Sequence, residues 1–236
     1  LASPSAHERA ETYARVISRA EKFFESRLGW KLPFRMLVLD RADWEKVATY
    51  PYPAPHIWNR EMLILMPRSL AEYPGFESWG FDDMKLNAIL TVHEMGHGLA
   101  HRNGLNANEA DYTITEVVAN ILMAAFIYEE APDMARLLDG APAGFKPTAE
   151  YQISDFDYYY GALGLHNYAW FQFELARAAG FIVREKPLEE LMPALVAHLN
   201  AGSNFLPEVN IGRLEAITPG VKARLASVMG KGLLPE

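Results

Sequence analysis

The chain has 236 residues, half of them apolar, and carries a formal net charge of -8. This length and composition allow a sizeable hydrophobic core in one large domain or in two subdomains. The negative charge and the lack of a basic stripe argue against a nucleic-acid partner. The chain has no cysteine, so disulfides and Cys-ligated zinc are excluded, and a metal must be held by His and carboxylate side chains.

The first residues and the longest apolar run are informative about the cellular localisation of the protein. The segment Leu1 to Ser5 is typical of the loose start of a mature exported protein, although a trimmed end reads the same way. We therefore expect an exported protein, periplasmic or secreted. The longest apolar run, Val117 to Tyr128, is too short to cross a bilayer, so we expect no transmembrane segment. The sequence does not indicate an oligomeric state.

The first part of the chain predicts short strands with helices around them. His7 to Leu28 has apolar residues at helical spacing, and Gly29 ends that helix. Phe34 to Asp40 is typical of a buried strand, and Arg41 to Ala48 predicts a short helix. A second strand is predicted over Glu61 to Met66. The residues leave open whether it lies at the sheet edge, where a peptide could pair with it, or in the core.

Helices dominate the rest of the chain. Asp82 or Asp83 can cap a helix that runs to about Arg102, and the next helix is predicted from Ile114 to about Glu130. The latter is apolar around most of its circumference, which indicates burial. Further helices are predicted over 161–179, which Gly180 ends, over 188–199, and over 211–229 with an interruption at Pro219.

This order of elements predicts an α+β fold. A small mixed sheet with helices is followed by a mainly helical C-terminal half. We place residues 1–104 in an N-terminal α/β subdomain and residues 105–236 in a helical subdomain. Together they are expected to form one catalytic unit, with the active-site cleft between them.

A metal-binding pattern, His93-Glu94-x-x-His97, lies inside one of the predicted helices. Residues four apart share one helix face, so both imidazoles can reach one ion, and Glu94 can lie beside it. In zincins this arrangement supplies two zinc ligands and a general base. We therefore predict a single Zn²⁺ ion held by His93 and His97, with Glu94 as the general base.

Catalytic zinc usually has three protein ligands, so a third must come from elsewhere. A metzincin would have Gly and His where this chain has Ala100 and Asn103, which excludes that class. His101 lies about 12 Å along the axis from His93 in a straight helix, too far to share the ion. We expect His101 to be solvated or to lie outside the ligand set, near the helix C-terminus.

Glu116 is the better candidate for the third ligand. Eighteen residues separate it from His97, and the apolar helix around it favours burial of a carboxylate that needs a cation. Asn120 follows on the same face and could accept a hydrogen bond from the far nitrogen of a ligand imidazole, which would fix its orientation. Glu109 and Asp111, in the connecting loop, are the alternatives.

The pattern His93-Glu94-x-x-His97, followed after eighteen residues by Glu116, resembles that of the gluzincins, the clan of thermolysin and the aminopeptidases of family M1. The order of predicted elements over residues 34 to 185 is similar to that of small peptidase MA-like proteins. The resemblance implies a zincin-like fold and a zinc metallopeptidase that hydrolyses peptide or protein substrates.

The resemblance has limits in the residues themselves. The chain has Thr113-Ile-Thr-Glu-Val117 where many relatives have Trp-Leu-x-Glu-Gly. It also lacks the Gly-x-Met-Glu-Asn segment with which M1 aminopeptidases hold a substrate amino group. Aminopeptidase specificity is therefore not expected from the resemblance, and the choice between endopeptidase and exopeptidase stays open.

The resemblance also implies a second donor to the tetrahedral oxyanion, which in gluzincins is a Tyr or His of a later helix. Tyr168 and His166 are placed for this role at the start of the helix predicted to end at Gly180. Further candidates, just upstream, are Tyr158, Tyr159 and Tyr160. Each of these side chains is also compatible with a packing role.

Two other functions compete with peptide hydrolysis. One is a catalytically silent zincin-like domain that binds a partner or has a structural role. The intact Glu94 argues against it, because a domain that only binds needs no base beside the metal. The other is a zinc-free helical domain in which the His residues lie in the core or at the surface.

Overall fold

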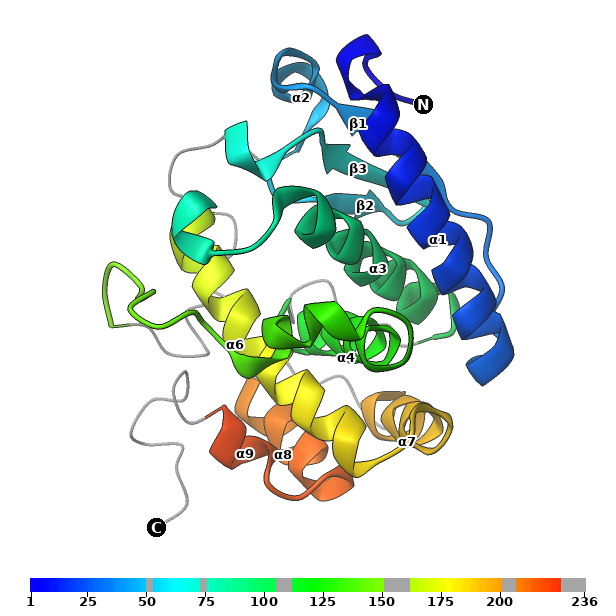
Figure 1. Ribbon diagram of the computed structural model, residues 1–236. Helices are drawn as coiled ribbons and strands as arrows, with labels where there is room; N and C mark the ends of the chain where they lie inside the picture. Colours follow the sequence, from blue (N-terminus) through cyan, green and yellow to red (C-terminus); the bar gives the residue numbers. More distant parts are fainter. Residues whose placement is uncertain (50–52, 73–75, 105–111, 151–161, 201–206, 226–236) are drawn as a thin grey trace. The chain divides into compact units, whose positions relative to one another are not determined.

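The computed structural model describes residues 1–49, 53–72, 76–104, 112–150, 162–200 and 207–225 (Figure 1). The chain divides into two compact units, Leu1–Leu99 and Ala100–Glu236, shortly before the boundary predicted after residue 104. The elements of the first unit are η1 (Pro4–Ala6), α1 (His7–Leu28), β1 (Arg35–Leu39), α2 (Arg41–Val47), β2 (His56–Trp58), β3 (Leu63–Pro67), η2 (Leu70–Glu72), η3 (Phe76–Trp79) and most of α3 (Asp83–Arg102). Those of the second unit are α4 (Tyr112–Glu130), η4 (Pro132–Asp139), α6 (Gly164–Glu185), α7 (Leu188–Asn200), α8 (Pro207–Ile217) and α9 (Val221–Arg224).

The strands of the first unit form a mixed sheet in the order β1-β3-β2. β1 and β3 are parallel, with Arg35 opposite Leu63, whereas β2 runs antiparallel to β3. The expected small mixed sheet is therefore confirmed, and so is the general α+β class. The possibility that residues 61–66 form an edge strand is wrong, because β3 has a neighbour on each side. One of these neighbours, β2, is a strand that the residue pattern did not predict.

The two faces of this sheet are covered by different parts of the first unit. Side chains of alternate strand residues, Leu39 and Leu65 among them, form a buried cluster with Trp44 of α2. On the opposite face, Met66 meets α3, with its sulfur 3.8 Å from the hydroxyl of Thr91. This alternation follows from the two-residue period of a strand, and it places α3 against the sheet.

The start of α3 is fixed by two consecutive carboxylates with different tasks. Asp82 is exposed, and its Oδ1 accepts a hydrogen bond of 2.9 Å from the backbone N–H of Lys85, as an N-cap residue does. Asp83 instead turns towards the rest of the unit and accepts hydrogen bonds from Ser69 Oγ and the backbone N–H of Leu70, each at 2.7 Å. It also pairs with Arg9 of α1. Asp83 thereby joins α3 to α1 and to the segment that follows β3.

In the second unit, α4 lies along α6, and both helices contact η4 (Figure 1). The structure extends α6 to Glu185, so the helix end predicted at Gly180 is wrong. Gly180 is instead a point of close packing: a Cβ there would lie 2.8 Å from Cβ of Leu138. The last predicted helix is divided, with α8 already starting at Pro207 and α9 following Pro219.

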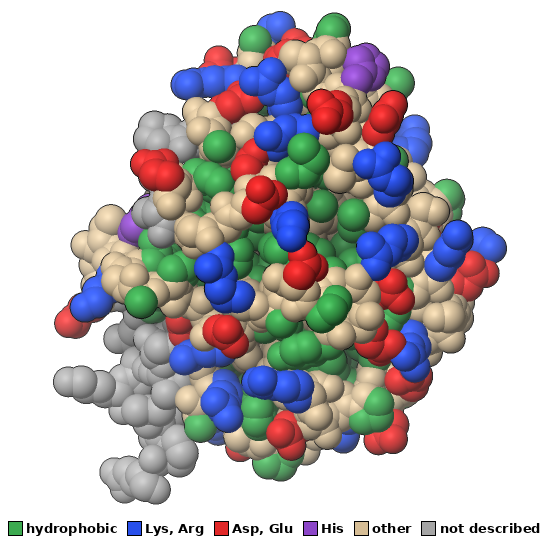
Figure 2. Space-filling view, in the orientation of Figure 1, with side chains coloured by type: hydrophobic (Ala, Val, Ile, Leu, Met, Phe, Trp, Pro, Cys, Tyr) green, Lys and Arg blue, Asp and Glu red, His purple; other side chains and the backbone are tan. Residues whose placement is uncertain are grey.

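The surface of the described residues carries both signs of charge. On the face drawn in Figure 2, Lys and Arg side chains are interspersed with Asp and Glu side chains, and hydrophobic side chains lie between them. Within the described ranges, no helix is both long and apolar enough to span a membrane, as the short apolar runs of the sequence predicted.

Candidate metal centre

Three potential metal ligands lie together within α3. His93 and Glu94 are buried, at 4% and 5% exposure, and His97 is half-buried. Their potential ligand atoms all lie within 4.8 Å of one another. Because these residues occupy positions i, i+1 and i+4 of one helix, the helix alone is enough to bring them together.

The two imidazoles face each other through the same ring nitrogen. Nε2 of His93 and Nε2 of His97 are 3.1 Å apart, and the ring planes are inclined at 85°. Two nitrogens bound to one tetrahedral zinc ion at 2.0–2.1 Å would be separated by about 3.3 Å. The observed spacing is close to that value, so the pair fits zinc without rearrangement of the helix.

A direct hydrogen bond between the two imidazoles would also explain this distance. It requires one Nε2 to carry a proton and the other to present its lone pair, which depends on the tautomers. A metal ion instead requires both Nε2 lone pairs to point at the same place. The carboxylate in this group belongs to Glu94, the predicted base, so the group itself supplies two of the three ligands that catalytic zinc usually has. The two imidazoles fit zinc in donor type and in spacing.

His101 lies apart from this group. It is exposed in the last turn of α3, and it is not among the residues whose ligand atoms converge. His101 is therefore solvent-exposed and outside the ligand group, as its distance along the helix predicted. Glu109 and Asp111, the loop alternatives to Glu116, lie outside the described residues, as do Tyr158, Tyr159 and Tyr160.

The remaining predicted site residues belong to the second unit, and all of those described except His166 form a second polar group there. Glu116 lies on α4 and is only 3% exposed, and Asn120, one turn later, is also buried. Gln172 of α6 donates from Nε2 to Oε2 of Glu116 at 2.7 Å and to the hydroxyl of Tyr168 at 2.8 Å. The structure thus brings Glu116, Asn120 and Tyr168 together around a glutamine that the sequence reasoning missed.

Asn120 makes its described contacts inside this group. Its Nδ2 donates to Oε1 of Gln172 at 3.0 Å and to the backbone carbonyl of Glu116 at 2.9 Å. The predicted bond from a ligand imidazole to Asn120 stays a prediction. What the structure adds is a contact in which Asn120 orients Gln172.

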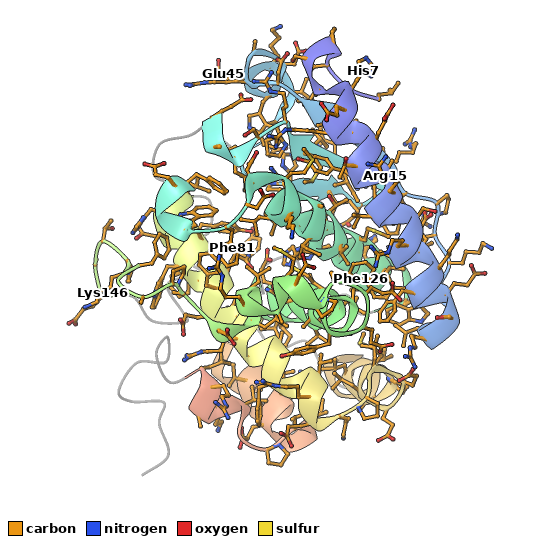
Figure 3. The ribbon with its side chains drawn as sticks, in the orientation of Figure 1. His7, Arg15, Glu45, Phe81, Phe126 and Lys146 are labelled. Atoms are coloured by element: carbon orange, nitrogen blue, oxygen red, sulfur yellow. The ribbon has the colours of Figure 1, made fainter. Side chains whose placement is uncertain are left out.

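The two candidate oxyanion donors have different surroundings. His166 is exposed, and its Nε2 donates to the backbone carbonyl of Lys146 at 2.6 Å, while its ring lies 4.5 Å from that of Phe145. Lys146 lies on the segment ahead of α6, with its side chain directed away from the helices (Figure 3). Tyr168 shares Gln172 with Glu116. Residues two apart on a helix face different directions, so only Tyr168 joins the group around Glu116.

The sequence around Gln172 contains one regularity, a polar pair with a spacing of four residues. It follows Tyr168 by four residues on α6, as Asn120 follows Glu116 by four on α4. Residues four apart lie on the same face of a helix, so the polar pair of one helix can meet the polar pair of the other when the two helices pack together. The sequence gives no sign, however, that these two helices are neighbours.

Comparisons of the chain with protein-family models, with curated proteins and with solved structures found no match.

Proposed function

We propose that the protein is a zinc-dependent peptidase of the gluzincin type. The observation that carries this proposal is the distance of 3.1 Å between His93 Nε2 and His97 Nε2. Glu94, which follows His93 in the sequence, is buried in the same helix. Two converging imidazoles beside a carboxylate on one helix are the arrangement that zincins use. The proposal extends beyond this observation to the third ligand and the reaction.

His93, His97 and Glu116 would hold the ion. Glu116 is supported by its spacing of eighteen residues from His97. Its carboxylate is buried but accepts a hydrogen bond from Gln172, so burial alone does not require a metal there. When bound, zinc would act as a Lewis acid and lower the pKa of a coordinated water towards about 7.

Glu94 is assigned the proton transfers. It takes a proton from the water that attacks the peptide carbonyl carbon, and it delivers that proton to the amine as the C–N bond breaks. The hydroxyl of Tyr168 is assigned to donate to the oxygen that becomes negatively charged. We favour Tyr168 over His166 because Tyr168 shares Gln172 with Glu116, whereas His166 bonds to Lys146.

Peptides and proteins are the proposed substrates. The strand that a substrate backbone would pair with is β2, since the other outer strand, β1, already pairs with the N-terminal segment through Ala2 and Val38. Trp58, at 36% exposure, offers apolar surface on this strand.

The deciding experiment combines metal analysis with peptide hydrolysis. The wild-type protein is expected to bind one zinc ion and to cleave members of a peptide library, and a chelator is expected to stop cleavage. Glu94→Gln should keep the zinc and lose at least about 10²-fold in kcat, since it removes the base and leaves the ligands. Glu45→Gln, at an exposed position of α2, is the matched control and should behave as wild type.

Three outcomes would contradict parts of the proposal. Full activity of Glu94→Gln would exclude its role as base. Zinc binding without cleavage of any library member would favour the silent, partner-binding domain. A wild-type protein that binds no zinc would leave the zinc-free helical domain as the remaining reading.

A further inference from the structure

We propose that Gln172 is a positioning residue that fixes the Glu116 carboxylate and the Tyr168 hydroxyl relative to each other. This inference rests on the proposed function, in which Glu116 binds the metal and Tyr168 meets the oxyanion. No motif pointed to Gln172, and it makes its contacts through a single amide group.

Both hydrogens of the Gln172 amide have an acceptor. Its Nε2 donates to Oε2 of Glu116 at 2.7 Å and to the oxygen of Tyr168 at 2.8 Å. A primary amide nitrogen has two hydrogens and no acceptor capacity, so these two bonds use it completely. Glu116 and Tyr168 are therefore tied to one atom, and their separation is set by the geometry of a planar NH₂ group.

Asn120 determines which way the amide faces. Its Nδ2 donates to Oε1 of Gln172 at 3.0 Å, and the same nitrogen donates to the backbone carbonyl of Glu116. If the Gln172 amide turned over, its NH₂ group would face the NH₂ group of Asn120, and its carbonyl would face the carboxylate. That orientation would lose the bonds with Glu116 and Asn120 and keep at most one, from the Tyr168 hydroxyl to the turned carbonyl, so the network favours the observed orientation.

The direction of each hydrogen bond suits the proposed roles. The Tyr168 oxygen accepts from Gln172, so the hydroxyl hydrogen is directed to a different group, as an oxyanion donor requires. Gln172 bonds to one carboxylate oxygen of Glu116, which disfavours binding of a metal through both oxygens. In metal sites, a hydrogen-bond partner commonly orients a ligand imidazole. Gln172 orients the Glu116 carboxylate and the Tyr168 phenol in the same way.

The competing explanation is a polar bridge that only joins α4 to α6. Arg184 provides a matched comparison, because it also joins these two helices, by placing its guanidinium 5.9 Å from the centre of the Tyr128 ring. Arg184→Leu removes that contact and leaves the group around Gln172 intact. A purely structural role for Gln172 would make the two positions behave alike.

The test measures zinc affinity and steady-state kinetics for the wild type, Gln172→Met and Arg184→Leu. Gln172→Met keeps the side-chain length and removes all three hydrogen bonds. It should weaken zinc binding, measured by chelator competition, by 10- to 100-fold, and lower kcat more than it changes KM. Arg184→Leu should match the wild type in both. Gln172→Asn keeps the amide but shortens the side chain, and it should show the same losses in zinc affinity and kcat as Gln172→Met. It replaces Gln172→Met in the test if that variant does not fold.

Wild-type zinc affinity and kcat in both Gln172 variants, with only a lower melting temperature, would overturn this inference and leave the proposed function standing. A wild-type protein that binds no zinc would overturn both. Equal losses in Arg184→Leu and Gln172→Met would also overturn the inference, because they would show that the contact between the helices is what matters.

Discussion

Gly98 of α3 lies against Ile57 of β2 so closely that a Cβ at position 98 would be only 2.9 Å from Cδ1 of Ile57. The same Cβ would be 2.7 Å from Cε of Met62 and 2.8 Å from Cε1 of Phe34. Separations below 3.0 Å essentially never occur at real Cβ atoms. Gly98 directly follows His97, so this contact sets how near the helix with the two histidines lies to the sheet.

Gly98→Ala is expected to destabilise the protein and to weaken zinc binding. Overpacking costs about 1–3 kcal/mol, and the better helix propensity of Ala returns at most about 1 kcal/mol. We therefore expect a net loss of about 1 kcal/mol, measured by urea denaturation. The three contacted side chains take up part of the overlap and the turn that carries His97 takes up the rest, so a weaker response to zinc should accompany the loss of stability.

Gly212→Ala is the matched control for that substitution. Gly212 lies within α8, and among the described residues no atom comes within 4 Å of its Cβ position apart from its own helix and neighbours. Without a steric overlap, only the higher helix propensity of Ala remains, so Gly212→Ala should raise the free energy of unfolding by about 0.5–1 kcal/mol. Opposite signs for the two substitutions would support close packing at Gly98. Stabilisation by both would contradict it.

Asp83→Asn is expected to cost about 2–3 kcal/mol. The substitution removes the charge opposite Arg9 and leaves backbone and hydroxyl donors facing an amide. Asp82→Asn, one residue earlier, should change stability by no more than a few tenths of a kcal/mol, since Asn caps a helix as well as Asp does. Denaturation curves of the two variants provide the measurement. Equal effects would show that Asp83 has no special role in anchoring α3.

The helices of the protein were largely predictable because their signals are local. The helix over residues 7–28 has a clear apolar period and ends at Gly29, whose φ of 68° places it in the left-handed region. Helix α3 was recognisable by its cap and by its end at Arg102. The group of His93, Glu94 and His97 needs nothing beyond helical spacing, so a short pattern was enough to locate it.

The features that were missed depend on contacts between distant segments. β2 has three residues, too few for a period, and it exists because Ile57 pairs with Ile64 of β3. Gly180 has the form of a helix stop but is required by the approach of Leu138. Gln172 has a role only because α6 lies beside α4. None of these contacts can be inferred from the composition of the segment itself.

Zinc is expected to raise the melting temperature of the wild-type protein. A ligand that binds only the folded state stabilises it by about 2.7 kcal/mol at 100 times its Kd. His97→Ala should abolish this response, whereas His7→Ala, at an exposed position of α1, should keep it. Thermal melts with zinc and with excess chelator provide the measurement. A zinc response in His97→Ala equal to that of the wild type would place the ion elsewhere.

His56 is expected to make the protein less stable as the pH falls below about 6.5. Burial lowers the pKa of the His56 imidazole from its usual 6.5, and the hydrogen bond with the Ala54 carbonyl opposes this only in part. Below pH 6.5 the unfolded chain therefore takes up this proton before the folded protein does. The free energy of unfolding then falls by up to about 1.4 kcal/mol per pH unit until the lower folded pKa is reached.

His56→Phe isolates this contribution from that of the other histidines. The variant keeps an aromatic ring against Trp44, whose ring centre is 5.5 Å from that of His56. The difference in unfolding free energy between the variant and the wild type should change between pH 7.5 and pH 5 in favour of the variant. A constant difference over this range would show that His56 titrates alike in the folded and unfolded chain.

The shortness of β2 has a consequence for self-association. An outer strand with open backbone groups is a template for pairing with other chains, and long, flat outer strands are where aggregation starts. β2 spans only His56–Trp58, or about 10 Å of extended chain. A strand of this length can pair with a peptide over a few residues, but it offers too few backbone hydrogen bonds for stable pairing with the sheet of a second copy. A strand this short is therefore a poor template for edge-to-edge aggregation.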